Sequence, residues 1–284
     1  MNFINNILEK LIAGRWIAGS NIDDVLEEAK AINKHNISAI LNYLGEDITD
    51  ENKIAETINV YKDLIDKIYE KRINADISIK PTQIGARINN TFLEKNYLYL
   101  IKYANSKNVF VWLDMEDHDV VDSTIKLYKK GLKYTNNIGI CIQSNLKRSI
   151  NDLNHLPRNS IIRIVKGAYA VDDKIGYNSK AKVNNNYKLL IKYLFENMGR
   201  FVVATHDIKM IEYAKSLNKK YKKNVSYAFL KGIMNEYAKE LAKSEKISMY
   251  IPFGDQWIQY SYRRMREAGH ISLILKSLMR NQKI

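Results

Sequence analysis

The sequence predicts an α/β protein built as a closed (β/α)8 (TIM) barrel, and three observations support this prediction. Eight short apolar runs rich in β-branched residues recur along the 284 residues, and their starts lie 23 to 40 residues apart. The segments between them, such as 54–70 (IAETINVYKDLIDKIYE), have the apolar spacing of helices. Near-continuous apolar strands suit a parallel sheet covered by helices, and eight such strand–helix units close into a barrel.

The elements follow in order along one expected domain, residues 1–284. Residues 1–36 are predicted to form an N-terminal helical arm, with Ser20 and then Asp23 at a helix start. The barrel occupies 37–256, and an eighth, substrate-binding helix with a C-terminal tail occupies 257–284. The predicted strands are 38–44 (SAILNYL), 75–81 (ADISIKP), 109–115 (VFVWLDM), 138–144 (IGICIQS), 161–167 (IIRIVKG), 201–207 (FVVATHD), 225–232 (VSYAFLKG) and 248–254 (SMYIPFG).

The eighth helix carries an unusual polar face. Asp255 is expected to cap it, since a carboxylate can accept a backbone N–H of the first turn. Helical spacings of three and four then place on one face Trp257, Tyr260, Arg263, Arg264 and Glu267. A charge run alone is usually solvated surface. Two guanidiniums beside a tyrosine and a carboxylate can also clamp a substrate carboxylate.

Polar side chains at the strand ends favour the interpretation of this helix face as a clamp for a substrate carboxylate. Active sites of such barrels are built at the carboxyl ends of the strands. Those ends carry Lys80, Asp114, Glu116, Gln143, Arg163, Lys166, Thr205, His206 and Tyr250. Because each buried charge must be paired or neutralised, this many polar groups on consecutive strands indicates an active site.

Composition narrows the function classes. The net charge of +14 could attract nucleic acid, anionic lipid or acidic metabolites. The densest basic run, 215–223 (KSLNKKYKK), has one aromatic residue and no nucleic-acid motif, so no nucleic-acid partner is expected. There is no apolar run of about 18 residues to span a membrane and no signal-peptide pattern in 1–13. The single cysteine, Cys141, excludes an intrachain disulfide. These features are typical of a cytoplasmic protein.

Three chemistries can be weighed against one another. Oxygen and imidazole ligands for a divalent metal are offered by Asp114, Glu116, Asp117, His118, Asp119 and His206. However, 117–119 lie past the strand end, where acidic residues often begin a helix, and no metal is expected. Lys80 could form a Schiff base, but Asp114 at the same mouth would keep it charged. Without a Gly-rich dinucleotide fingerprint or a Walker loop, a nucleotide cofactor would lie across the barrel mouth.

Eight motifs in order are similar to those of one family. They are SAILNYLGE, SIKPTQIG, VWLDMED, CIQSNLKRS, IRIVKGAY, VATHD, YIPFG and the helix Tyr-x-x-Arg-Arg-x-x-Glu, between Arg15 and Glu267. The chain resembles the proline dehydrogenase family, in its monofunctional, FAD-dependent form. The resemblance implies oxidation of L-proline to 1-pyrroline-5-carboxylate, the first step of proline catabolism to glutamate. Hydride would pass to flavin N5, and the electrons would pass on to a quinone.

The resemblance also implies roles on the substrate side. Arg263, Arg264 and Lys80 would hold the proline carboxylate, and Glu267 would orient an arginine. Asp114 would pair with Lys80 and Tyr250. Tyr250 and Tyr260 would wall the proline ring.

On the cofactor side, the resemblance implies that Arg163 donates to the isoalloxazine near N5. Gln143 would contact the flavin ring. The remaining FAD contacts implied are Lys166, Gly167, Ala168, Thr205 and His206. The chain departs from the family pattern at Pro81, Asn145, Asn184 and Ala228, and Asn145 and Ala228 bear on the flavin contacts.

Alternatives remain for the substrate and for the protein class. A flavin dehydrogenase of 4-hydroxyproline or another cyclic imino acid would share the fold, although a bulky Tyr250 favours proline. A basic scaffold that binds nucleic acid would be colourless. Beyond Gly269, the apolar and basic segment 270–284 suggests weak peripheral contact with the anionic inner face of a membrane, alongside the alternative that it packs on the barrel.

Overall fold

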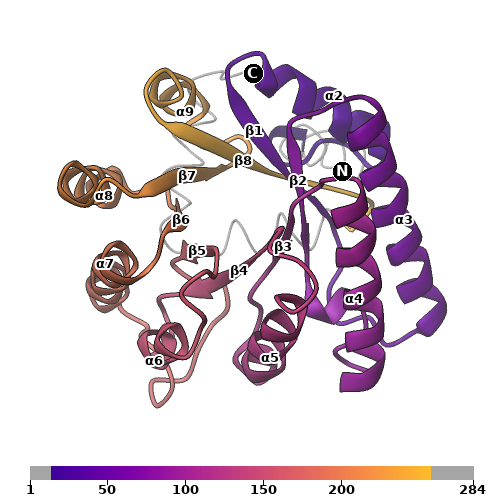
Figure 1. The fold of residues 1–284 in the computed structure, drawn as a ribbon, viewed down its shortest axis with the longest axis horizontal. Helices are drawn as coiled ribbons and strands as arrows, with labels where there is room; N and C mark the ends of the chain where they lie inside the picture. The colour runs from indigo at the N-terminus through magenta and orange to yellow at the C-terminus, as the bar shows by residue number, and fades with distance from the viewer. Residues whose placement is uncertain (1–13, 257–284) are drawn as a thin grey trace, which may run out of the picture.

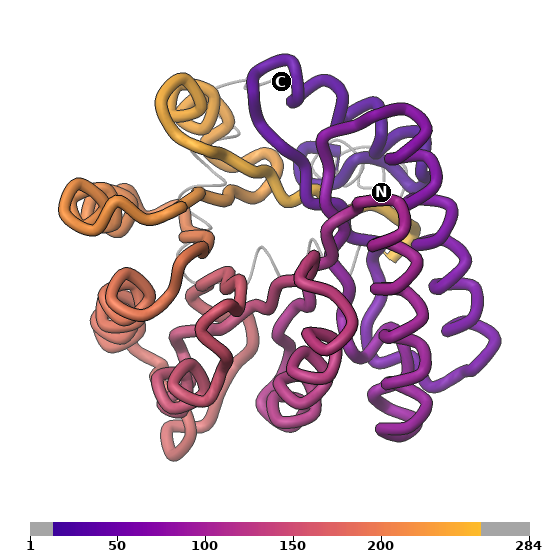
Figure 2. The backbone as a smooth tube through the Cα atoms, viewed as in Figure 1, coloured from indigo at the N-terminus to yellow at the C-terminus, as the bar shows by residue number. Residues whose placement is uncertain are grey.

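The computed structural model describes residues 14–256, which form a closed barrel of eight parallel strands. Each strand pairs with the next along the chain, and β8 returns to pair with β1. Figure 1 shows the helices arranged around the outside of the strands, and the backbone trace in Figure 2 follows the same circular order. The predicted fold class is therefore confirmed.

Every predicted apolar run overlaps one strand. The strands are β1 (Ile37–Tyr43), β2 (Ala75–Ile79), β3 (Val111–Leu113), β4 (Ile138–Gln143), β5 (Ile162–Val165), β6 (Arg200–Ala204), β7 (Asn224–Leu230) and β8 (Lys246–Phe253). They end one to three residues before the predicted ends. After β2 the reason is Pro81, which lacks an N–H for the ladder and opens a 3-10 turn.

Within residues 14–256, one helix precedes the first strand and the others lie between the strands, as their periodicity predicts. They are α2 (Ile22–Asn33), α3 (Glu51–Glu70), α4 (Asn90–Ser106), α5 (Val121–Gly131), α6 (Ser149–Asn154), α7 (Lys180–Asn197), α8 (Ile208–Tyr221) and α9 (Asn235–Leu241). Two 3-10 turns, η1 (Pro81–Gln83) and η2 (His118–Val120), follow β2 and β3. None of the helices in residues 14–256 has an apolar stretch of the length needed to cross a bilayer.

Short polar side chains begin several of these helices. Asp50, Asn89, Ser179 and Asp207 each accept a backbone N–H from the first turn of α3, α4, α7 and α8. For α2 the cap is Asn21, one residue after the predicted Ser20, and its side chain accepts from Asp24 N at 2.9 Å. An Asn amide caps as well as a Ser hydroxyl, so the sequence alone does not separate them.

The segment before α2 is tied to the end of β8. Ala18 N donates to Pro252 O at 3.0 Å, and Gly254 N donates to Gly19 O at 3.1 Å. Arg15 lies so close to Gly232, after β7, that a Cβ at Gly232 would sit 2.2 Å from Arg15 O. The described part of the N-terminal arm therefore packs beside β7 and β8.

The core has two layers because side chains alternate along each strand. On the stretch through β3, Val111 and Leu113 face outward and join the large apolar cluster between strands and helices. Phe110 and Trp112 face inward with Ile40, Ile161, Val202 and Ala228. The same alternation turns Asp114 inward, so the barrel interior leads from an apolar layer up to a polar mouth.

Candidate active site

A buried ion pair lies inside the barrel, toward the carboxyl ends of the strands. Arg163 of β5 is 3% exposed, and its Nη2 pairs with Asp114 Oδ1 just past β3. The same Nη2 donates to Ser78 Oγ at 3.0 Å, and Ser78 donates to Asp114 Oδ1 at 2.8 Å. Arg163 Nε donates to Cys141 Sγ at 2.8 Å. Groups from β2, β3 and β4 therefore hold one guanidinium of β5.

Two aromatic rings enclose this guanidinium. Its central carbon lies 4.8 Å from the Trp112 ring centroid and 5.4 Å from that of Tyr250. The Tyr250 hydroxyl donates to Asp114 Oδ2 at 2.7 Å, which is the contact expected between these two residues.

Burial raises the pKa of Cys141 to about 12, so its thiol is protonated at neutral pH.

One donor of the Arg163 guanidinium has no acceptor within residues 14–256. Arg163 Nη1 is buried and has no hydrogen-bond partner among the described residues. A buried donor left unsatisfied costs about 1–3 kcal/mol. The geometry therefore leaves Arg163 able to donate to a ligand in the barrel mouth.

The expected pairing of Lys80 with Asp114 is wrong. Lys80, one residue past β2, pairs instead with Glu46 in the loop after β1, and both side chains are 12% exposed. The oxygens of Asp114 already accept hydrogen bonds from Arg163, Ser78 and Tyr250. Sequence reasoning missed Glu46, although the position of this acidic residue, two places beyond the first predicted strand, was a usable signal.

A second polar group joins the ends of β2, β3 and β4. Glu116 is 2% exposed and accepts from Thr82 N at 2.8 Å and from Thr82 Oγ1 at 2.6 Å. Burial raises the pKa of Glu116 to about 7, against the lowering effects of nearby Lys80 and of the Thr82 hydrogen bonds. Gln143 Nε2 donates to the backbone O of Glu116 at 2.9 Å. The side chains considered above as metal ligands form no metal-binding cluster within residues 14–256.

The ends of β5 and β6 carry a third group. Lys166 Nζ lies 2.8 Å from Asp207 Oδ2, and Asp207 N donates to Thr205 Oγ1 at 3.1 Å. His206 Nε2 accepts from Leu230 N of β7 at 3.0 Å, which fixes the imidazole between the two strands. Three of the residues with implied FAD contacts therefore lie beside one another.

The loop after β5 turns at Gly167, which has a φ of +104°. A Cβ there would lie 2.1 Å from Asn145 Oδ1, so the loop passes tightly over the Asn145 side chain. Asn145 Nδ2 donates to Tyr169 O at 3.0 Å, and Tyr177 N donates to Asn145 O at 2.7 Å. Asn145, where the chain departs from the family pattern, therefore holds this loop through its side chain and its backbone. Ala168, next to Gly167, is exposed.

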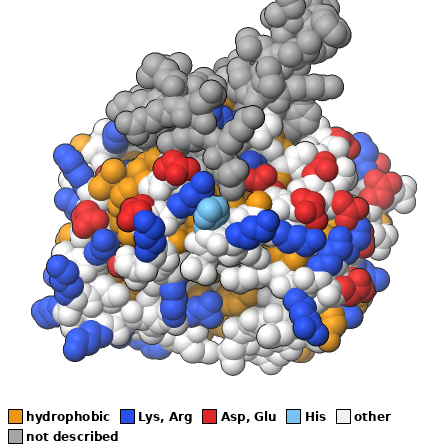
Figure 3. All heavy atoms as spheres, turned by 90° about the horizontal axis from the view of Figure 1, so that it is seen from above, with side chains coloured by type: hydrophobic (Ala, Val, Ile, Leu, Met, Phe, Trp, Pro, Cys, Tyr) orange, Lys and Arg blue, Asp and Glu red, His pale blue; other side chains and the backbone are white. Residues whose placement is uncertain are grey.

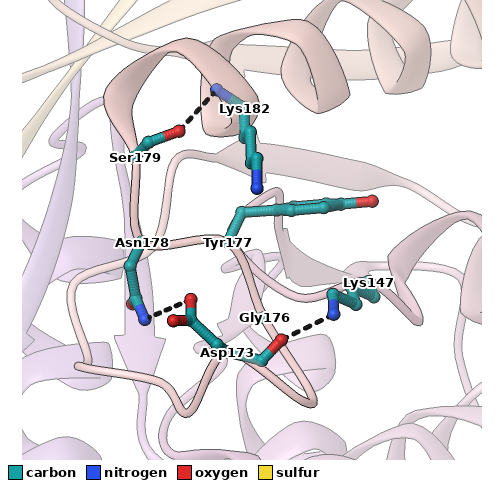
Figure 4. A pocket seen from close by; sticks show the side chains of 7 residues that line it. All are labelled: Lys147, Asp173, Gly176, Tyr177, Asn178, Ser179 and Lys182. Carbon is teal, nitrogen blue, oxygen red and sulfur yellow. Dashed lines mark hydrogen bonds between the residues drawn. The ribbon is translucent and has the colours of Figure 1, made fainter.

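A cavity of about 650 Å³, missed by sequence reasoning, lies between the loops after β4 and β5 and the start of α7. Figure 4 shows the Lys182 side chain directed toward Tyr177, with Lys147 on the other side. Lys147 Nζ donates to Asp173 O at 2.6 Å, and Asn178 Nδ2 to Asp173 Oδ1 at 2.9 Å. The cavity is lined by Lys147, Asp173, Gly176, Tyr177, Asn178, Ser179 and Lys182. Two lysines and a helix start favour an anionic ligand group.

Part of the predicted site lies outside the described residues. These residues are Trp257, Tyr260, Arg263, Arg264 and Glu267.

Of the predicted site residues within 14–256, the structure brings together Arg163, Asp114 and Tyr250 in one group. Lys80 and Gln143 lie at the neighbouring strand ends, and Lys166, Thr205 and His206 lie at the next ones.

Comparison with known proteins gives a consistent result. A family model described as proline dehydrogenase matches residues 25–276. The proline dehydrogenase of Deinococcus radiodurans is 30% identical over 268 residues, which is 90% of this chain and 86% of the relative. Proline dehydrogenase 1 of Bacillus subtilis is 28% identical over 277 residues, which is 95% of this chain and 92% of the relative.

Solved structures share the fold. Proline utilization A from Bdellovibrio bacteriovorus, inactivated by N-propargylglycine, superimposes with a TM-score of 0.87 at 21% identity and covers 99% of this chain. Proline utilization A from Corynebacterium freiburgense gives 0.78 at 20% identity and covers 96%. The chain spans 35% and 33% of the lengths of those two proteins. At these identities the likeness shows the (β/α)8 fold alone.

Proposed function

The chain belongs to the proline dehydrogenase family, and from this premise we propose that it oxidises L-proline to 1-pyrroline-5-carboxylate, with FAD as the hydride acceptor. The electrons then pass to a quinone. The observation that carries the proposal is Arg163, a buried guanidinium held by three strands with one donor left without an acceptor in the described part of the chain.

The residues present fit a flavin. Arg163 Nη1 has no acceptor in the described part of the chain, and the isoalloxazine ring offers several. Oxidation of a C–H bond needs a hydride acceptor that side chains lack, and FAD supplies it when bound. We assign the ring contacts to Arg163 and Gln143, and the ribityl and phosphate contacts to Lys166, Gly167, Ala168, Thr205 and His206. Arg163 then stabilises negative charge that develops on the acceptor.

The cavity of Lys147 and Lys182 extends this assignment. Its two ammonium groups and the N-terminus of the 18-residue helix α7 suit an anionic part of a dinucleotide that reaches beyond the barrel mouth. Ser179 already caps that helix, so the cavity can bind charge without rearranging the cap.

On the substrate side, we propose that Arg263, Arg264 and Lys80 hold the proline carboxylate and that Glu267 orients one arginine. Lys80 can serve while paired with Glu46, because an ammonium has three donors. We propose that Tyr250 and Tyr260 wall the substrate ring. The hydrogen bond from Tyr250 to Asp114 pins the tyrosine ring in place, which supports proline over a substrate with an extra hydroxyl.

The decisive test is the absorbance spectrum of the purified protein. We expect a flavin band that bleaches on anaerobic addition of L-proline, with 1-pyrroline-5-carboxylate formed in equal amount, and slower bleaching with 4-hydroxyproline. A flavin-loaded protein whose band does not respond to L-proline would contradict the proposal. Faster bleaching by 4-hydroxyproline would favour the alternative substrate.

The clamp can be tested separately with Arg264→Met, which keeps the aliphatic stem and removes the fork. Loss of a charge-assisted contact with the substrate carboxylate should cost on the order of 2–5 kcal/mol, seen as a raised KM for proline with flavin retained. The matched variant is Arg263→Met. Wild-type KM in both variants would show that the clamp is elsewhere.

A further inference from the structure

A column of two rings and two guanidinium groups in contact with one another runs along the inside of the barrel beneath Arg163. The Trp112 ring, 2% exposed, packs on the Arg163 guanidinium at 4.8 Å and on the Phe110 ring at 4.9 Å between centroids. Arg200 lies at the start of β6, and its guanidinium carbon is 5.3 Å from the centroid of the Phe110 ring. The Trp112 ring therefore supports the Arg163 guanidinium from the side of the apolar layer.

The indole is itself held by a carboxylate. Trp112 Nε1 donates to Asp76 Oδ2 at 2.9 Å, and Asp76 lies on β2 two residues before Ser78, which contacts Arg163. Asp76 is partly buried at the amino-terminal end of the barrel. Burial raises its pKa to about 6, against the opposing effects of Trp112, Arg200 and Arg163. Glu70, Arg72 and Lys107 line the same opening.

The neighbouring strand makes room for this ring. Gly139 of β4 pairs directly with Trp112 in the ladder, and a Cβ there would lie 2.4 Å from Trp112 Cζ3. Glycine weakens a strand interior, and it often marks a place where another group approaches closely. Simple filling of the interior would need neither this glycine nor a partly buried carboxylate that accepts an indole N–H.

We propose that Asp76 and Trp112 are positioning residues for Arg163. Asp76 accepts the indole N–H and so fixes the plane of the Trp112 ring. The face of that ring in turn fixes the tilt of the Arg163 guanidinium, so that its Nη1, which has no partner among the described residues, points toward the flavin. Cys141, Ser78 and Asp114 bind Nε and Nη2 of the guanidinium, and contact with the Trp112 ring limits how far this planar group can tilt, which sets the direction of Nη1. This inference rests on the proposed function, because the aim of Arg163 matters only if a flavin is its acceptor.

The variants are Asp76→Leu, which removes the acceptor, Asp76→Asn, which keeps an acceptor oxygen, and Trp112→Phe, which keeps a ring and removes the N–H. Ile65→Val, in the fully buried outer core of α3, is the control for general loosening. All are compared as full-length, flavin-loaded proteins for the flavin midpoint potential, the rate of flavin reduction in one turnover, and the proline Kd.

We expect Asp76→Leu and Trp112→Phe to shift the flavin potential negative and to slow reduction by about tenfold or more, because a donor aimed at developing charge is displaced. The proline Kd should stay within about twofold, since the substrate clamp is untouched. Asp76→Asn should recover most of the rate and potential, and Ile65→Val should match the wild type. If Trp112→Phe fails to fold, the Asp76 pair decides the question.

A readout independent of flavin and proline is the indole N–H resonance of Trp112, assigned by its loss in Trp112→Phe. We expect it to titrate with a midpoint near pH 6 in the wild type and to stay constant in Asp76→Asn, as the pKa of Asp76 implies. A wild type that reduces its flavin with proline, while Asp76→Leu and Trp112→Phe equal Ile65→Val in potential and rate, would overturn this inference alone. A wild type that does not respond to proline would instead overturn the proposed function.

Discussion

Glu116 and Asp76 are two carboxyl groups inside the barrel whose pKa values lie well above their usual range, at about 7 and about 6. In each case burial is the main cause, and hydrogen bonds from Thr82 or Trp112 only partly offset it. Glu116 sits at the polar mouth and Asp76 at the opposite end. Both groups therefore take up protons in the folded protein at a pH where the unfolded chain has released them.

The raised pKa of Glu116 makes the free energy of unfolding depend on pH. Between pH 4.5 and 7 the folded state keeps a proton on Glu116 that the unfolded state loses, so the free energy of unfolding falls as pH rises. Relative to the wild type, Glu116→Gln should gain on the order of 3 kcal/mol between pH 4.5 and 8. Urea unfolding at several pH values measures this, with exposed Glu236→Gln as the control. Parallel curves for wild type and Glu116→Gln would contradict the assignment.

At the scale of elements, two helices are each joined to the barrel strands by a tyrosine hydroxyl that contacts strand carbonyl groups. Tyr61 of α3 donates its hydroxyl proton to Ser78 O of β2 at 2.8 Å. The hydroxyl of Tyr187 in α7 lies 3.1 Å from both Ile164 O of β5 and Ala204 O of β6. Both side chains are fully buried. These contacts anchor the helices to the strand ends that carry the site.

Removing one such hydroxyl should loosen the anchor. Tyr187→Phe leaves the ring in place but deprives a buried carbonyl of its donor, so we expect a loss of about 1–2 kcal/mol in the free energy of unfolding. The urea midpoint should fall with an unchanged slope. Tyr213→Phe, on the partly exposed face of α8, should change little. Equal effects of the two substitutions would show that the Tyr187 hydroxyl contributes nothing specific.

At the scale of the whole molecule, charge is the main feature. The sequence carries a net charge of +14. On the face drawn in Figure 3, Lys and Arg side chains are interspersed with Asp and Glu rather than gathered in one basic region. The segment 270–284, outside the described residues, combines apolar residues with His270, Lys276, Arg280 and Lys283. A lipid-soluble acceptor would place the enzyme near a membrane.

We therefore expect weak, salt-sensitive binding to anionic membranes without insertion. Each basic group near the surface contributes about 1 kcal/mol, so a few are enough for reversible attachment. Co-sedimentation with anionic and neutral liposomes at low and high salt measures it, using the full chain and a chain ending at Gly269. Equal binding to both lipids, or unchanged binding of the shortened chain while it remains folded, would rule out this contact.

By itself, the sequence determined the barrel and the end of it that carries the polar groups. Run length and periodicity are local properties, so eight apolar runs between helical segments are enough to predict eight strands in order. The direction of a parallel barrel then places Lys80, Asp114, Arg163 and Tyr250 at one mouth. The sequence does not fix the element boundaries, because one hydrogen bond decides whether the first described helix starts after Asn21 or after Ser20.

Only the tertiary structure decided which of these groups touch. Asp114 pairs with Arg163, 49 residues away, while Lys80 turns to Glu46. Trp112 rests against Gly139 and Asp76 because strand register brings β2, β3 and β4 into line. Barrel closure and register set these distances, and no local pattern encodes them. The inventory of polar groups was therefore readable from the chain, whereas their pairing required all eight strands to be in place.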